Sequence, residues 1–166
     1  MDASADEEFS EFMQGRWAQL VRLGYGLTGD LQLAEDLAQT AFARAYAAWP
    51  RVRRADDPDA YIRRIVVNAN RNRFRKLRVS EQLTDAPPDL AAAPLSGRED
   101  RALLIQELMR LSYGQRAAVV LRYWLDMSES QAAAVLGCSV GNVKSQAARG
   151  LAKLRSSAAL IEGGLL

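Results

Sequence analysis

Hydrophobic residues recur three and four positions apart along most of the chain, which is the spacing of buried helix faces. The first set is Phe9, Phe12, Met13, Trp17, Leu20 and Leu23. The second set is Leu33, Leu37, Ala41, Phe42, Ala45 and Trp49. Glycines between residues 24 and 29 are predicted to interrupt the first helix, Asp30 to cap the second, and Pro50 to end it. No segment alternates as a strand would, so the pattern predicts an all-α fold.

A basic amphipathic helix is predicted from Pro58 to about Arg78, with Asp57 as its N-cap. Its apolar face consists of Ile62, Ile65, Val66 and Ala69. Its opposite face carries Arg64, Asn68, Arg71, Arg75 and Arg78. Because surface helices usually mix charge signs, a purely cationic face indicates an anionic partner, either nucleic acid or an anionic membrane surface. Tyr61 and Phe74 could stack on an unpaired base or simply pack in the core.

Residues 79–100 differ in composition from the segments on either side. They hold three of the five prolines and five acidic residues, and they show no helical periodicity. This composition predicts an extended, flexible linker. The chain is therefore expected to form two small helical domains, at residues 1–78 and 101–166.

The second domain has the pattern of a helix-turn-helix. Ser128 and Gln131 form a capping-box pair that starts a short helix, and Gly137 supplies the turn. Ser139 is predicted to cap a last helix that runs to about Ser156. Its expected inner face is Val143, Ala147, Gly150 and Leu154, and its outer face is Gly141, Ser145, Ala148 and Ala152. Small residues flanked by lysine and arginine suit a helix in the DNA major groove, although an alanine-rich helical hairpin has the same pattern.

The net charge of the 166-residue chain is only +2, but charge is unevenly distributed along it. Residues 1–50 carry −5, residues 51–78 carry +7, residues 79–138 carry −3, and residues 139–166 carry +3. Two basic segments separated by an acidic one are typical of a chain that contacts a polyanion at two places.

Several chemistries are excluded by composition. The chain has no histidine and only one cysteine, Cys138, so histidine-based catalysis, zinc sites and internal disulfides are ruled out. Composition alone does not exclude a metal held only by carboxylates. We nevertheless expect no metal and no cofactor, and the absence of histidine agrees with a protein that is not itself an enzyme. The acidic N-terminus is unlike a signal peptide, and no apolar run is long enough to span a membrane, so a cytoplasmic protein is expected.

Two stretches resemble a known family. Residues 111–126 (LSYGQRAAVVLRYWLD) and 136–145 (LGCSVGNVKS) resemble the C-terminal domain of bacterial sigma factors. Residues 34–42 (AEDLAQTAF) and 58–68 (PDAYIRRIVVN) resemble the polymerase-binding and promoter-melting region of the same family. Their order matches the extracytoplasmic-function group of the sigma-70 family, and most closely its actinobacterial sigma-E subgroup.

This resemblance implies a promoter-specificity subunit with three sets of contacts. Core RNA polymerase would contact Glu35, Asp36, Gln39 and Phe42 through its β′ clamp helices. The single-stranded −10 element would contact Trp49, Tyr61, Arg64, Asn68, Arg71 and Arg75. The duplex −35 element would contact Ser139, Val140, Gly141, Asn142, Lys144, Ser145, Arg149 and Lys153. The second domain would also touch the β flap, and an anti-sigma factor is a further candidate partner.

Some positions depart from the family pattern. The family often has tryptophan at Tyr61, aspartate at Asn72 and arginine at Gln146, and the last difference bears on −35 base preference. Ala132 stands where the family commonly has isoleucine, and this smaller side chain is expected to reduce the apolar volume of the core under the helix-turn-helix. The alternative functions are a stand-alone helix-turn-helix regulator, which would usually dimerise, and a helical interaction module. Because we find no heptad seam, we expect a monomer when the chain is free.

Overall fold

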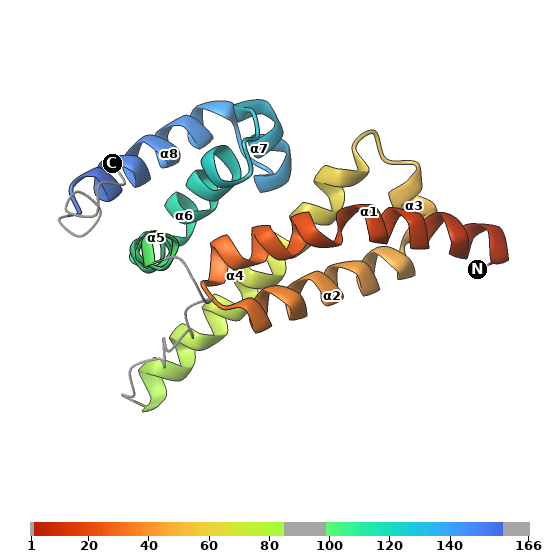
Figure 1. Ribbon diagram of the computed structural model, residues 1–166, viewed down its shortest axis with the longest axis horizontal. Helices are drawn as coiled ribbons and strands as arrows, with labels where there is room; N and C mark the ends of the chain where they lie inside the picture. The colour runs from red at the N-terminus through yellow and green to blue at the C-terminus, as the bar shows by residue number, and fades with distance from the viewer. Residues whose placement is uncertain (1, 85–98, 158–166) are drawn as a thin grey trace.

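The regular elements of this chain are helices throughout the ranges that the computed structural model describes, residues 2–84 and 99–157 (Figure 1). The helices are α1 (Ala3–Thr28), α2 (Leu31–Ala47), α3 (Trp49–Arg53), α4 (Pro58–Thr84), α5 (Glu99–Met109), α6 (Tyr113–Val119), a π-helical turn η1 (Val120–Trp124), α7 (Glu129–Leu136) and α8 (Val140–Arg155). The predicted all-α fold is confirmed. In these ranges no helix is long and apolar enough to cross a bilayer.

The first half of the molecule, α1 to α4, is built on the long pair α1 and α2, with α4 packed against both (Figure 1). The predicted caps are present: Asp30 accepts a hydrogen bond from the backbone N–H of Leu33, and Asp57 accepts one from that of Ala60. The prediction that the glycines interrupt α1 is wrong for the first two. The helix continues through Gly24, where a Cβ would lie 2.9 Å from the Cα of Ala34, and α1 ends at Gly29, whose φ is 70°.

The segment after α2 also differs from the prediction. Helix α2 ends at Ala47, and Pro50 lies in the first turn of the short helix α3 instead of simply terminating the preceding helix. Arg51 and Arg53, which follow Pro50, therefore lie within α3. This is consistent with the preference of proline for the start of a helix, where its missing N–H costs nothing.

The second half, α5 to α8, contains the expected helix-turn-helix in α7 and α8. The capping box of Ser128 and Gln131 is formed in both directions, and Gly137 has the left-handed φ of 67°. Ser139 caps α8 as predicted, accepting from the N–H of Asn142 at 3.0 Å. Helix α6 is followed directly by the wider turn η1, after which the backbone N–H of Leu125 donates to the carbonyl oxygen of Val120.

The two halves also pack on each other. The C-terminal end of α1 contacts α5 and η1, and α4 contacts α7 (Figure 1). The buried apolar residues of both halves form one connected core cluster. The predicted linker overlaps two helices, because α4 runs to Thr84 and α5 begins at Glu99. Its middle, residues 85–98, lies outside the described residues.

Candidate nucleic-acid interface

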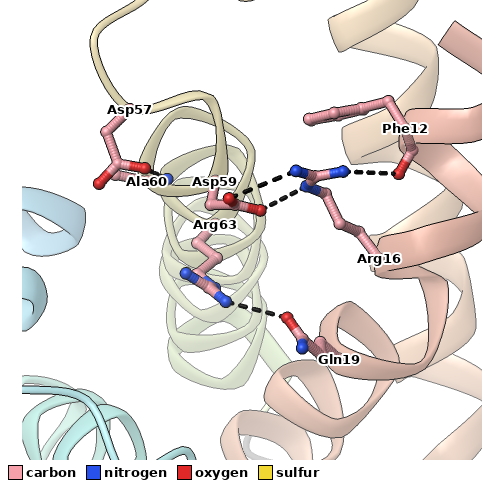
Figure 2. A network of polar contacts seen from close by, with 7 residues as sticks. All are labelled: Phe12, Arg16, Gln19, Asp57, Asp59, Ala60 and Arg63. Carbon is pink, nitrogen blue, oxygen red and sulfur yellow. Dashed lines mark hydrogen bonds and ion pairs between the residues drawn. The ribbon is translucent and has the colours of Figure 1, made fainter. Parts of the chain in front are cut away.

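The start of α4 is fixed to α1 by a network of polar contacts (Figure 2). The guanidinium of Arg16 forms an ion pair with Asp59 and also donates to the carbonyl of Phe12 at 3.3 Å. One turn along α4, Arg63 donates to the side chain of Gln19 at 3.0 Å. Asp59 is the acidic residue in the first turn of α4, on the N-terminal side of the cationic face. Because Asp59 is paired with Arg16, it does not offset the positive charge of that face.

The polar face of α4 has the predicted composition. Arg64, Asn68, Arg71 and Arg75 are exposed, while Ile62 and Val66 on the other side are buried. Within the residues that the structure describes, no carboxylate lies within ion-pair distance of these three arginines. Burial of the apolar side under α1 and α2 also removes the surface that a membrane-bound helix would need. Tyr61 is half-buried beside the core.

Two predicted contact residues are core residues instead. Trp49 is only 3% exposed, and its ring centroid lies 5.2 Å from that of Phe9 and 5.1 Å from that of Phe12. Phe42 is 4% exposed and packs on Phe12 and Trp17. Neither ring is available to stack on a base or to contact a second protein. The prediction of direct contacts at both positions is therefore corrected: these rings hold α1, α2 and α3 together.

The other predicted polymerase-contact residues lie on the outer side of α2. Asp36 and Gln39 are exposed, and Glu35 is half-buried. Asp36 accepts a hydrogen bond from Gln32 at 3.1 Å, and in the described residues it forms no ion pair. This short acidic surface thus remains open to a partner.

All residues predicted to contact the −35 element are exposed on α8 or at its N-cap. The inner face is buried as predicted, at Val143, Ala147, Gly150 and Leu154. Lys144 lies 3.8 Å from the carboxylate of Glu129 on α7, whereas Arg149 and Lys153 have no carboxylate partner in the described part of the chain. The outer face is consequently cationic and lined by small side chains, as a major-groove helix requires. Ala132 is fully buried in the support of this helix.

A hollow of about 520 Å³ lies between the two candidate DNA surfaces. Its lining includes Asn68, Arg71 and Arg75 from α4, and Cys138, Asn142 and Gln146 from the helix-turn-helix. Gln146 lies against α6, where a Cβ on Gly114 would be 3.2 Å from its Nε2. Sequence reasoning missed the contribution of Tyr113 and Cys138 to this hollow. No local pattern could have indicated it, because the hollow exists only when the halves dock.

Buried polar groups support the docked arrangement. Tyr113 donates to the carbonyl of Val67 on α4 at 2.6 Å, and burial raises the pKa of Tyr113 to about 12. Arg116 is 5% exposed and donates to the carbonyls of Leu108 and Leu27, each at 3.0 Å. Burial lowers the pKa of Arg116, yet four backbone carbonyls in all satisfy its guanidinium. These carbonyls come from the ends of α1 and α5 and the turn after α5, so Arg116 ties the halves together.

Comparison with known proteins identifies both halves. The family profile described as sigma-70 region 2 matches residues 16–79, and that described as sigma-70 region 4 matches residues 101–154. The chain is 42% identical over 152 residues to RNA polymerase sigma-E factor of Streptomyces coelicolor, covering 89% of this chain and 84% of the relative. It is 32% identical over 149 residues to the ECF RNA polymerase sigma factor SigM of Mycobacterium tuberculosis, covering 88% of this chain and 74% of the relative.

Solved structures agree on the fold. The sigma factor RpoE of Bartonella quintana, determined in complex with the anti-sigma factor NepR, gives a TM-score of 0.72 at 24% identity and covers 90% of this chain and 95% of that one. CnrH, determined with the cytosolic domain of CnrY, gives 0.66 at 27% identity and covers 95% and 90%. Sigma factors are in general non-catalytic promoter-recognition subunits. This chain belongs to the extracytoplasmic-function group of the sigma-70 family, and it is a promoter-specificity subunit of RNA polymerase, not a stand-alone regulator.

Proposed function

We propose that the two cationic faces divide promoter recognition between them. The face of α4 with Arg64, Asn68, Arg71 and Arg75 binds the unpaired −10 strand, and Tyr61 borders it. The outer face of α8 lies in the major groove of the −35 duplex. The observation that carries this division is the absence of ion-paired carboxylates from the α4 face within the described residues, combined with the small-residue surface of α8.

The mechanism follows from what each surface can bind. Contacts from α8 to duplex DNA position the holoenzyme without opening the helix. Amide and guanidinium groups on α4 bind phosphates and base edges that are exposed only when the −10 strands separate. Binding energy at α4 therefore stabilises the melted state relative to the closed duplex, and the protein promotes melting without performing a chemical step.

The remaining partners are assigned from the exposed acidic surface of α2. Glu35, Asp36 and Gln39 would bind the β′ clamp helices of core RNA polymerase, with Phe42 acting from the core to hold α2 in place. The second half would contact the β flap. We place the protein with the polymerase in the cytoplasm, and an anti-sigma factor remains a candidate regulator.

The test uses holoenzyme reconstituted from core RNA polymerase, on promoters identified by sequencing the transcript starts that it produces. Two probes separate the surfaces: a duplex carrying both elements, and a shorter fork carrying only an unpaired −10 strand. Arg71→Ala combined with Arg75→Ala should weaken binding to both probes. Lys144→Ala combined with Arg149→Ala should weaken binding to the long duplex alone.

The matched control is Arg110→Ala, which removes a cation whose side chain is 78% exposed at the end of α5, outside both faces. It should leave both affinities unchanged. Removing a cation that binds a DNA phosphate should also reduce the slope of log affinity against log salt by about 0.9 on the duplex. Equal reductions in affinity on both probes for the α8 double variant would contradict the proposed division, and so would full retention of fork binding by the α4 double variant.

A further inference from the structure

A carboxylate at the start of α7 lies beside α8, between two cations. The Oε2 atom of Glu129 is 3.8 Å from the Nζ of Lys144, and its Oε1 atom is 4.0 Å from a guanidinium nitrogen of Arg122. Arg122 is itself anchored, because it also donates to the backbone carbonyl of Met127. The three side chains therefore form a row of alternating charges across η1, α7 and α8, with Lys144 at its outer end.

The pair with Lys144 is close without being a direct hydrogen bond. Bonds from a charged N–H to a carboxylate are usually about 2.7–2.9 Å long, so all three donors of the Lys144 ammonium remain available. The side chain of Lys144 is 65% exposed, whereas that of Glu129 is 33% exposed. The Oε2 atom of Glu129 is shielded from solvent and accepts no hydrogen bond within the described residues. Lys144 can therefore face this oxygen and a ligand outside the protein at the same time.

The cations of α8 differ in this respect. Arg149 and Lys153 have no carboxylate partner in the part of the chain that the structure describes. Attraction to DNA phosphates depends on positive charge, so cations without a partner are best suited to it. A cation whose charge is offset gains less from a phosphate, but its N–H donors still bond directionally to base acceptors such as the N7 and O6 atoms of guanine. Lys144 is therefore the cation of α8 best suited to base readout.

Restraint of Lys144 acts in the same direction. Immobilising a long, flexible side chain at an interface costs free energy. Because Glu129 already limits where the Lys144 ammonium lies, part of that cost arises on folding and not on DNA binding. A base edge accepts a donor only from a fixed direction, whereas a phosphate tolerates many positions. Restraint by Glu129 consequently favours the base contact over the phosphate contact.

We propose that Glu129 is a positioning residue for recognition of the −35 element: it holds the Lys144 ammonium toward the base edges and offsets its charge, so that Lys144 discriminates between sequences instead of adding to sequence-independent affinity. This inference rests on the proposed function of α8. An acidic residue in the first turn of a helix also stabilises that helix through its dipole. That structural role alone would alter stability and would leave sequence discrimination unchanged.

The test compares two promoter duplexes that share one −10 element, the first with the cognate −35 element and the second with a scrambled one. Holoenzyme carrying Glu129→Gln should bind the scrambled duplex more tightly, and the ratio of the cognate to the scrambled affinity should fall about threefold, in the range of one surface ion pair.

The matched control is Asp126→Asn, which removes the same charge from an exposed position three residues away. Asparagine tolerates the left-handed φ of 53° at this position. Asp126 forms no ion pair within the described ranges. The control should raise both affinities by the same factor and leave their ratio unchanged.

A second variant, Lys144→Met, shows whether Glu129 acts through Lys144. In a chain with Lys144→Met, adding Glu129→Gln should no longer change the affinity ratio. Lys144→Met should hardly alter the slope of log affinity against log salt when Glu129 is present, and should reduce it by about 0.9 when Glu129→Gln is present. The proposal is overturned by an equal change of slope in both backgrounds. It is also overturned if Glu129→Gln lowers the urea midpoint of unfolding but leaves the affinity ratio unchanged.

Failure of this proposal differs from failure of the proposed function. If Lys144→Ala combined with Arg149→Ala does not weaken binding to the long duplex, the assignment of α8 is wrong and the role of Glu129 is overturned with it. If that double variant weakens binding but Glu129→Gln leaves the affinity ratio unchanged, the assignment of α8 stands and the positioning role of Glu129 is excluded.

Discussion

The cores of the two halves of the molecule differ in the proportion of large and small side chains. Between α1, α2 and α3 the core contains large rings, among them Phe9, Phe12, Phe42 and Trp49. Between α6, α7 and α8 the buried positions are mostly small, and they include Ala117, Ala132, Ala133, Val135 and Val143. Rings fill much of the space among α1, α2 and α3, in addition to the close contact of Gly24 with Ala34. Alanine and other small residues dominate the contacts among the shorter helices α6 to α8.

This difference determines which kind of substitution destabilises each half most. A core of rings is weakened most by removing volume, since the neighbours cannot collapse into a large cavity. A core of small residues is weakened most by adding volume, because a close helix contact has no room for another carbon atom. The halves should therefore respond with opposite sensitivity to substitutions that shrink or enlarge a side chain.

The largest effect is expected from Trp49→Ala in the first half. Truncating a buried tryptophan costs about 3–5 kcal/mol, and Trp49 contacts both Phe9 and Phe12. Urea unfolding followed by circular dichroism would measure this destabilisation. The comparison variant is Tyr123→Ala, whose exposed ring should change stability by no more than about 0.5 kcal/mol. Unchanged stability of Trp49→Ala together with abolished −10 binding would instead support the direct contact with the −10 element that the family resemblance implies.

A smaller effect is expected from enlarging the second half at Gly150. A Cβ there would lie 2.6 Å from a methyl group of Val119 and 3.3 Å from the carbonyl oxygen of Gln115. Overpacking of this kind costs about 1–3 kcal/mol, so Gly150→Ala should destabilise the protein although alanine favours helices. The same unfolding experiment measures it.

The matched control for Gly150 lies on the same helix. At Gly141 the nearest atom to an added Cβ is Ser139 Oγ at 3.9 Å, so Gly141→Ala should stabilise α8 by up to about 1 kcal/mol. Opposite signs at the two positions would confirm that close approach to α6 limits the second half. Stabilisation by alanine at both positions would show that helix propensity dominates, and it would contradict the proposed limit on the second half.

Structural features that depend only on residues close together in the chain could be predicted from the sequence. The caps at Asp30, Ser128 and Ser139, the turn at Gly137 and the buried stripe of α8 are local patterns, and each is confirmed. The exposed cationic face of α4 could be predicted for the same reason, because one helix determines which residues share a face. The assignment of these residues to DNA stays a prediction.

Features that depend on distant segments could not be predicted. Gly24 and Gly26 look like helix breakers until Ala34 and Val120 are known to lie against them. The spacing assigns Trp49 to the apolar face of the second predicted helix, but it does not show that α3 brings its ring against Phe9. The docking of Tyr113 on α4 joins residues 46 positions apart in the chain, and no periodicity encodes such a pair.

The smallest effect concerns the contact between the halves at Tyr113, whose hydroxyl donates to the carbonyl of Val67. This contact is polar, so its stability depends on neither the loss nor the addition of side-chain volume. Tyr113 has its pKa raised from 10.0 to about 12, chiefly by burial, against the opposing influence of Arg71 and Arg116 and a hydrogen bond with Asn70. The folded state thus holds this proton more tightly than the unfolded state. The stabilisation is complete below about pH 10 and disappears as the pH rises towards 12.

Tyr113→Phe should therefore remove part of the alkaline instability. Near neutral pH the variant should be less stable by about 0.5–1.5 kcal/mol, because it lacks the hydrogen bond to Val67. Unfolding midpoints of the two proteins should then converge as the pH rises above 10, since only the native chain carries the titrating hydroxyl. Tyr25 is also buried and raised in pKa, but it titrates in both proteins and its effect cancels. A constant difference between the midpoints would show that Tyr113 is solvated in the free chain, and therefore that this contact is open.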